Sequence, residues 1–184
     1  MGLTNRSVGK YSLAKNIKFS KKNENDKVIS IVGNPNVGKS TVFNGLTGLK
    51  QHTGNWPGKT VVSTDGTFKY KDTNYIVIDL PGTYSLMVNS IEEEIARDFI
   101  CFGKSDVIVV VCDATCLERN LNLVLQTLEI TNNILVCVNL LDEANKKKID
   151  INLDLLEKKL GVPVVGTSAK NKKTLRALVE KIYD

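Results

Sequence analysis

Short apolar runs alternate with longer stretches whose apolar residues recur at helical spacing over most of the chain. A run such as 107–112 (VIVVVC) is typical of a strand buried on both faces, and 174–183 is typical of a helix with one apolar side. This alternation predicts a three-layer α/β fold. The predicted strands are 28–32, 61–70, 75–79, 107–112, 134–138 and 163–165, and the predicted helices are 39–46, 91–102, 117–130, 153–160 and 174–183.

One pair of strands departs from the parallel pattern. Residues 61–70 and 75–79 flank a short turn, and this spacing suits an antiparallel hairpin. We therefore expect a mostly parallel six-stranded sheet with one antiparallel edge strand and helices on both faces. Residues 48–60 are polar and glycine-rich and contain Pro57, so we expect a long loop there, and such loops are usually functional.

The net charge of the 184-residue chain is confined to one end. Residues 1–27 hold seven Lys and Arg side chains against two acidic ones, so this segment carries the whole net charge of +5. We expect a basic, disordered leader at 1–27 and one folded domain at 28–184. Because the folded part is neutral, no nucleic-acid partner is expected.

The cysteines and the apolar runs bear on the cellular compartment. The four cysteines form no CxxC pair and the chain has one histidine, so we expect reduced thiols and a reducing compartment. The apolar run at 107–112 is far shorter than the roughly 20 residues that span a bilayer, and the first residues lack the apolar core of a signal peptide. We expect a soluble protein in the cytosol.

The segment 33–40 (GNPNVGKS) matches the phosphate-binding pattern G-x-x-x-x-G-K-[ST] between a predicted strand and a predicted helix. Its backbone N–H groups are expected to hold the α- and β-phosphates, Lys39 to reach the β- and γ-phosphates, and Ser40 to bind Mg²⁺. The predicted phosphate-contacting residues are Gly33, Asn34, Pro35, Asn36, Val37, Gly38, Lys39, Ser40 and Thr41.

The segment DLPG follows the second strand of the predicted hairpin. Its carboxylate, Asp79, is expected to hold Mg²⁺ through a water molecule, and the N–H group of Gly82 to contact a γ-phosphate. The pattern D-x-x-G is common by itself. Its position directly after a strand makes it informative.

Two further segments follow the last two strands and predict recognition of guanine. In NLLD, Asn139 and Asp142 end a strand, and the carboxylate can accept hydrogen bonds from the guanine N1 and N2 groups, which adenine lacks. In TSA (Thr167, Ser168 and Ala169) a backbone N–H group can donate to guanine O6. The ordered set of segments predicts GTP as the ligand.

This ordered set resembles the Ras-like GTPases, which implies the P-loop GTPase fold. The resemblance makes Thr60, with its neighbours Gly58 and Lys59, the switch segment whose threonine adds its hydroxyl to Mg²⁺ when GTP is bound. Leu140 stands where the family usually has the lysine that covers the base, so nucleotide exchange is expected to be quick. Thr83 stands where many members place the glutamine that orients the attacking water, so Thr83, a switch backbone group or an added ion must position that water.

A narrower resemblance covers most of residues 28–184. GNPNVGKST, QHTGNWPGKTVV, DLPGTYSL, NLLDEA and LGVPVVGTSA are similar to the amino-terminal G domain of the FeoB ferrous iron transporters. The resemblance implies a K⁺ ion held by Asn36 with the carbonyl groups of Gly54 and Trp56, although the side chain of Trp56 can equally anchor the loop on the body. The candidate catalytic residues are then Lys39, Asn36, Thr60, Gly82 and Thr83.

The same resemblance implies partners and a location. We expect a helical insert and a membrane permease in the full protein, with the G domain at the cytoplasmic face of the inner membrane and with a small accessory transport protein as a further partner. The leading hypothesis is Mg²⁺-dependent GTP hydrolysis stimulated by K⁺. The alternatives are an RNA- or ribosome-associated GTPase switch that uses the basic leader, and a regulator of a permease that acts by nucleotide occupancy without hydrolysis.

Overall fold

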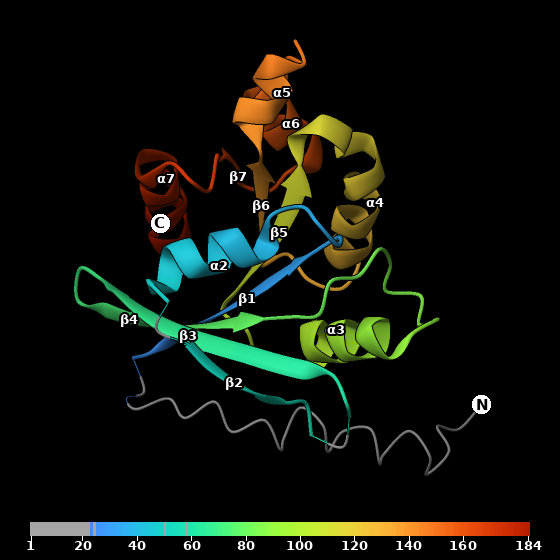
Figure 1. Ribbon diagram of the computed structural model, residues 1–184, viewed down its shortest axis with the longest axis vertical. Coiled ribbons are helices and arrows are strands. Elements are labelled where there is room, and N and C mark those ends of the chain that lie inside the picture. Colours follow the sequence, from blue (N-terminus) through green and yellow to red (C-terminus); the bar gives the residue numbers. More distant parts are fainter. Residues whose placement is uncertain (1–22, 24, 50, 58) are drawn as a thin grey trace.

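One mixed sheet runs through the centre of the molecule in a computed structural model, which describes residues 23, 25–49, 51–57 and 59–184 (Figure 1). Within those residues the sheet has seven strands in the order β2-β3-β4-β1-β5-β6-β7. The strands are β1 (Lys27–Gly33), β2 (Gln51–Asn55), β3 (Val62–Tyr70), β4 (Thr73–Asp79), β5 (Val107–Asp113), β6 (Ile134–Asn139) and β7 (Val164–Gly166).

The strand directions agree with the predicted mostly parallel sheet. β1 pairs in parallel with both β4 and β5, and β6 and β7 continue the parallel order. β3 runs antiparallel to β4, as the hairpin predicts. The doubly wound order places β1, the first strand along the chain, in the middle of the sheet, where it is buried on both faces.

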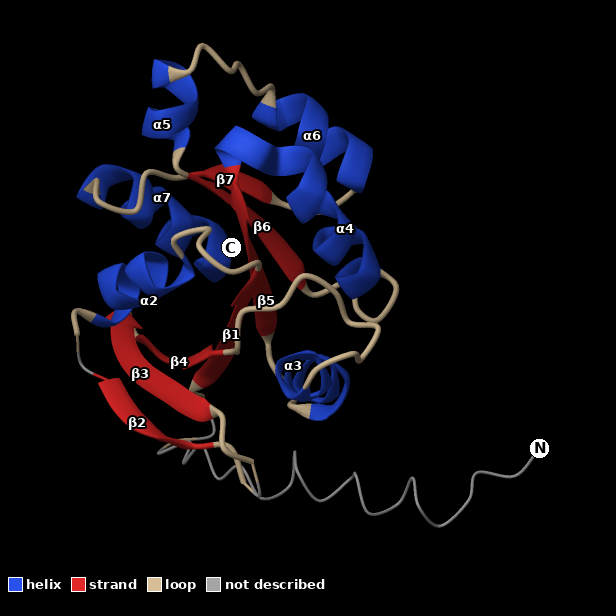
Figure 2. Ribbon diagram, turned by 45° about the vertical axis from the view of Figure 1, so that its right-hand side comes forward, coloured by secondary structure: helices blue, strands red, loops and turns tan. Residues whose placement is uncertain are grey.

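Helices cover both faces of the sheet (Figure 2). Apolar side chains alternate along each central strand, so that Ile29 and Ile31 join one core with α2 and α7, whereas Val28 and Val32 join the other core with α3 and α4. The three-layer fold is therefore confirmed. The helices are α2 (Lys39–Thr47), α3 (Ile91–Phe102), α4 (Leu117–Leu128), α5 (Leu141–Lys146), α6 (Leu153–Leu160) and α7 (Lys172–Tyr183), with a short 3₁₀ turn at Ala114–Cys116.

The prediction of six strands is corrected to seven. The segment 48–60, predicted to be a loop, contains the edge strand β2, which pairs antiparallel with β3 from Gln51 opposite Gly66 to Asn55 opposite Val62. Every residue of β2 is exposed. A strand that buries no side chain shows no apolar alternation, so its sequence carried no signal.

A short helix was also missed. α5 spans six residues and buries only Ala144, too little for a helical pattern in the sequence. The folded part begins slightly earlier than residue 28, because β1 starts at Lys27 and the buried carboxylate of Asp26 accepts a hydrogen bond from the Asn74 side chain at 3.2 Å. The rest of the predicted leader, 1–22 and 24, lies outside the described residues.

The four predicted nucleotide-binding segments follow β1, β4, β6 and β7, whose carboxyl ends lie at one edge of the sheet. Ligands of open α/β sheets bind at this edge. Within the described ranges, no helix combines the length and apolar character needed to cross a bilayer.

Candidate functional site

The segment between β1 and α2 has the backbone of a phosphate-binding loop. Gly38, the N-cap of α2, has a φ of 80°, and a Cβ atom there would fall on the side-chain amide of Asn139. A Cβ at Gly33 would lie 2.6 Å from the Val111 carbonyl oxygen. Asn36 also adopts a left-handed conformation, with φ 67°. Glycine at positions 33 and 38 thus lets the loop curl tightly around the start of α2, where unpaired N–H groups attract anions.

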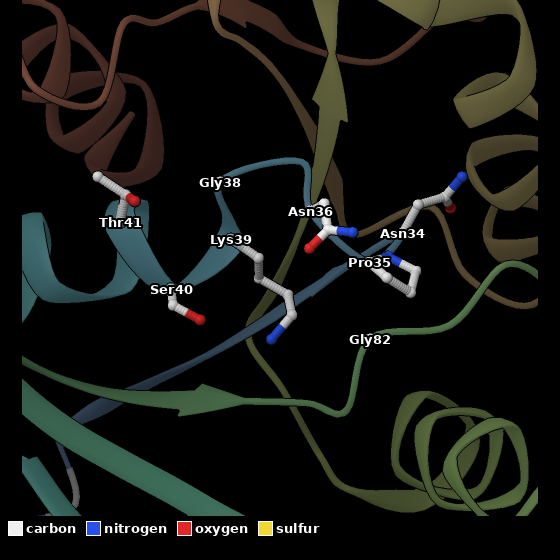
Figure 3. Close-up of a pocket in the computed structure, with 8 residues that line it drawn as sticks. All are labelled: Asn34, Pro35, Asn36, Gly38, Lys39, Ser40, Thr41 and Gly82. Atoms are coloured by element: carbon white, nitrogen blue, oxygen red, sulfur yellow. The ribbon is translucent and has the colours of Figure 1, made fainter.

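A pocket of about 540 Å³ opens over this loop (Figure 3). The side chains of Lys39 and Ser40 project from the start of α2 (Figure 3). In this view Asn36 lies above them, and the side chain of Asn34 points away from Lys39. The Asn34 side-chain oxygen is buried without a hydrogen-bond partner among the described residues. The lining residues are Asn34, Pro35, Asn36, Gly38, Lys39, Ser40, Thr41 and Gly82, all but Gly82 from the phosphate loop and the first turn of α2.

Lys39 and Asp79 form an ion pair that joins the phosphate loop to the end of β4. Their side chains are 12% and 14% exposed. Burial raises the pKa of Asp79 above its ordinary value, and the neighbouring Lys39 ammonium offsets part of that rise. A cation placed here would compete for the Asp79 carboxylate, and a bound phosphate would compete for the Lys39 ammonium.

Asn139, at the end of β6, connects three of the predicted segments. Its fully buried side chain donates to the Val37 carbonyl at 3.0 Å and accepts hydrogen bonds from the Thr167 hydroxyl and the Ala169 N–H group, each at 3.0 Å. The phosphate loop and the TSA segment are therefore held by one amide. Asn139 thus braces both segments, and its contact with guanine stays a prediction.

The two residues after Asn139 shape the expected base site. Leu140 adopts a left-handed conformation, with φ 63°, and is the N-cap of α5. The exposed Asp142 follows in the first turn, where its N–H group donates to the Ser168 hydroxyl at 3.1 Å. The carboxylate of Asp142 and the backbone of the TSA segment thus lie on neighbouring elements.

The segment after β4 lies against the phosphate loop. The N–H group of Thr83 donates to the Gly33 carbonyl at 3.1 Å, and a Cβ on Gly82 would lie 3.5 Å from Pro35. Thr83 is buried, and its hydroxyl donates to the Ser85 carbonyl at 2.7 Å. The hydroxyl is thus already engaged within its own turn in this arrangement.

Of the predicted switch and potassium residues, Asn36 lines this pocket, whereas Gly54, Trp56 and Thr60 do not. Gly54 lies in β2 opposite Ser63, and the Trp56 carbonyl accepts from the Lys59 N–H group at 2.9 Å. Thr60 is exposed and does not line the pocket. Gly58 lies outside the described residues.

The side chain of Trp56 is a loop anchor. It is 3% exposed and packs edge-on against Phe99 of α3 with ring centroids 5.5 Å apart. Lys59 extends this anchor through an ion pair with Glu94 of α3 at 2.9 Å. Ser90 caps α3 by accepting from the Glu93 N–H group. Nothing in the sequence indicated that Glu94 pairs with Lys59.

Comparison with known proteins decides the family. Residues 27–182 match the family model described as ferrous iron transport protein B. The Fe(2+) transporter FeoB of Salmonella typhimurium is 44% identical over 154 residues, which cover 82% of this chain and 20% of the relative. The chain belongs to the FeoB family. It spans about a fifth of the length of the curated FeoB relatives it matches.

Solved FeoB structures share the fold. The G domain of the T. maritima FeoB iron transporter is 43% identical, with a TM-score of 0.81 over 86% of this chain and 97% of that one. The cytosolic domain of T. maritima FeoB in its GMPPNP form is also 43% identical, with a TM-score of 0.83 over 85% of this chain and 62% of that one. The P-loop GTPase fold of a FeoB amino-terminal domain is therefore confirmed.

The predicted ligands of Mg²⁺ and those of K⁺ differ in how near they lie to the pocket. Ser40 and Asp79 offer hydroxyl and carboxylate oxygens, the hard donors that Mg²⁺ prefers, beside a loop built for phosphates. For K⁺ only Asn36 lines the pocket, whereas Gly54 and Trp56 lie on the segment anchored to β3 and α3. A complete K⁺ site therefore needs movement of that segment.

Proposed function

We propose that this chain binds GTP with Mg²⁺ and hydrolyses it to GDP and phosphate, as the cytosolic G domain of a ferrous iron transporter. The observation that carries the proposal is the ion pair between Lys39 and Asp79 beside the phosphate loop. A lysine ammonium from the start of α2 and a carboxylate from the end of β4 are the groups that a nucleoside triphosphate and its Mg²⁺ need there. Membership of the FeoB family supports the same conclusion.

The roles of the phosphate-side residues follow from their positions. The N–H groups at the start of α2 bind the phosphates, and Lys39 turns from Asp79 to the β- and γ-phosphates. Ser40 and Asp79 hold Mg²⁺, which when bound neutralises charge on the phosphates. The N–H group of Gly82, which lies against Pro35, contacts the γ-phosphate.

Selection of guanine rests on the other end of the site. Asp142 accepts from the base, a backbone N–H group of the TSA segment donates to guanine O6, and Leu140 covers the face of the base with an aliphatic side chain. Asn139 holds these segments at a fixed distance from the phosphate loop. An adenine base would leave the Asp142 carboxylate without donors, which disfavours ATP.

A monovalent cation beside Asn36 is proposed to stimulate hydrolysis. Positive charge near the phosphates stabilises the negative charge of the transition state. For this the segment that holds Gly54, Trp56 and Thr60 leaves its anchors on α3 when GTP binds. In the full-length protein we place the domain at the cytoplasmic face of the membrane, joined to a permease and served by a small accessory protein.

The deciding experiment is GTP turnover by the purified chain with Mg²⁺ in potassium and in sodium buffer, with Asn36→Ala measured beside it. We expect turnover in potassium to exceed turnover in sodium, and Asn36→Ala to remove the difference. Equal rates in the two salts would remove the potassium role. Tight GTP binding with no turnover in either salt would favour a regulator that acts by nucleotide occupancy.

A further inference from the structure

Side chains of helix α4 hold the segment that follows β4 through hydrogen bonds and a cation–π contact. The side-chain oxygen Oε1 of Gln126 accepts hydrogen bonds from the Leu86 N–H group at 2.7 Å and from the Ser85 hydroxyl at 3.3 Å. The guanidinium of Arg119 lies over the Tyr84 ring, 4.5 Å from its centroid. Arg119 and Gln126 are two turns apart and share one face of α4. Three consecutive residues, Tyr84 to Leu86, are therefore held from one helix.

Hydrogen bonds connect the segment held by α4 to the phosphate loop. The Ser85 carbonyl accepts from the Thr83 hydroxyl at 2.7 Å, and the Thr83 N–H group donates to the Gly33 carbonyl at 3.1 Å. Gly82 precedes Thr83 and lines the nucleotide pocket. A continuous set of contacts therefore runs from α4 through residues 85 and 83 to the backbone beside the pocket.

We infer that Gln126 is a positioning residue for the triphosphate end of the site, an inference that rests on the proposed function. By fixing Ser85 and Leu86 it sets where Thr83, and hence the Gly82 N–H group, stands relative to the phosphate loop. Thr83 has its hydroxyl engaged and buried, so the backbone of this segment, rather than the Thr83 side chain, faces the γ-phosphate and the attacking water. Gln126 acts through that backbone and is not among the residues that line the pocket.

The chemistry of the contact supplies a matched pair of variants. Both hydrogen bonds use the oxygen of Gln126 as acceptor, so Gln126→Glu keeps an acceptor of the same reach. Gln126→Met keeps the length and the helix propensity but offers no comparable acceptor. GDP binding depends on the phosphate loop and the guanine segments, so it serves as the internal reference for intact fold.

The test measures three quantities on the wild type and both variants: GDP affinity, the affinity for a non-hydrolysable GTP analogue, and GTP turnover with Mg²⁺ in potassium buffer. In Gln126→Met we expect unchanged GDP affinity, a lower ratio of analogue to GDP affinity, and turnover reduced by roughly 10-fold or more, because small displacements of positioning groups are costly. Gln126→Glu should restore both. Arg119→Met should lower the same ratio by a smaller factor, since its contact with the ring of Tyr84 is half-exposed.

Other outcomes overturn the inference. An unchanged ratio in Gln126→Met, an equal loss in Gln126→Glu, or a parallel fall in GDP affinity would show that Gln126 has no positioning role. Absence of turnover in the wild type would instead refute the proposed hydrolysis, and the affinity ratio would still report on Gln126.

Discussion

The side-chain amide of Asn139 donates to the backbone carbonyl of Val37 at 3.0 Å, and this bond ties the end of β6 to the phosphate loop. Asn139 is fully buried, and its oxygen accepts from two groups of the TSA segment. In Asn139→Ala the Val37 carbonyl and the Ala169 N–H group lose their partner. We expect the free energy of unfolding to fall by roughly 3 kcal/mol and GDP affinity to fall about 10-fold, as measured by denaturant titration and nucleotide binding.

Thr167→Val is the matched control for Asn139→Ala. It removes the hydroxyl that donates to Asn139 and also contacts the Cys137 thiol at 3.2 Å, and it leaves the bond to Val37 in place. A loss of about 1 kcal/mol in unfolding free energy with near-normal GDP affinity is expected. If the two variants weaken GDP equally, the bond to Val37 does not organise the phosphate loop.

Two glycines of the site differ in what the fold demands of them. A methyl group on Gly82 would meet Pro35 at 3.5 Å, an ordinary contact, so the unliganded fold tolerates alanine there. Gly82→Ala should keep its unfolding free energy within about 0.5 kcal/mol and its GDP affinity, but lose affinity for a GTP analogue. Gly38→Ala, with φ 80° and the Asn139 amide in the way, should lose stability and all nucleotide binding. If both substitutions lower stability and GDP affinity equally, glycine at position 82 is required by the fold and not by the γ-phosphate.

The ionisation of Asp79 makes stability depend on pH. Its pKa is raised above 3.8 by burial, which outweighs the effect of Lys39. Between the ordinary and the raised pKa the folded state binds more protons than the unfolded state, so the contribution of Asp79 to stability falls as pH rises through this window. Relative to Asp79→Asn without nucleotide, the wild type should therefore lose stability as pH increases from about 4. Chemical denaturation across this range tests it, and a difference that grows in the opposite direction would mean that Lys39 dominates.

Much of the fold and the phosphate side of the site could be predicted because strong local patterns specify them. The central strands bury both faces, and the predicted helix at 91–102 matches α3 in both bounds. The strand β2 was missed because its stability comes from backbone pairing to β3, which side-chain patterns do not record.

The site contacts that were missed join residues far apart in the sequence. Asn139 was predicted to belong to the guanine site beside Asp142, and its hydrogen bond to Val37 of the phosphate loop is a contact that no motif spacing indicates. Gln126 and Glu94 lie on amphipathic helices, whose sequence pattern predicts the helix but names no partner for either side chain. Only tertiary packing brings such polar side chains to the segments that they hold.

Trp56 is the only tryptophan in the chain and reports on the segment that carries Thr60. Its ring is buried against Phe99, so the unliganded protein should emit at the short wavelengths of a buried indole. If Gly54, Trp56 and Thr60 reach the pocket with GTP, a GTP analogue with Mg²⁺ in potassium buffer should shift that emission, whereas GDP should not.

Lys59→Met sharpens the fluorescence test because it removes the ion pair with Glu94 without touching the ring contact. A partly exposed pair of this kind contributes up to about 1 kcal/mol, so the shift should occur at analogue concentrations up to about 5-fold lower. Glu94→Gln should act in the same direction. If the analogue binds and the emission stays unchanged, the segment remains on α3. Gly54 and Trp56 would then be excluded as potassium ligands, and a K⁺ ion at Asn36 would need other ligands.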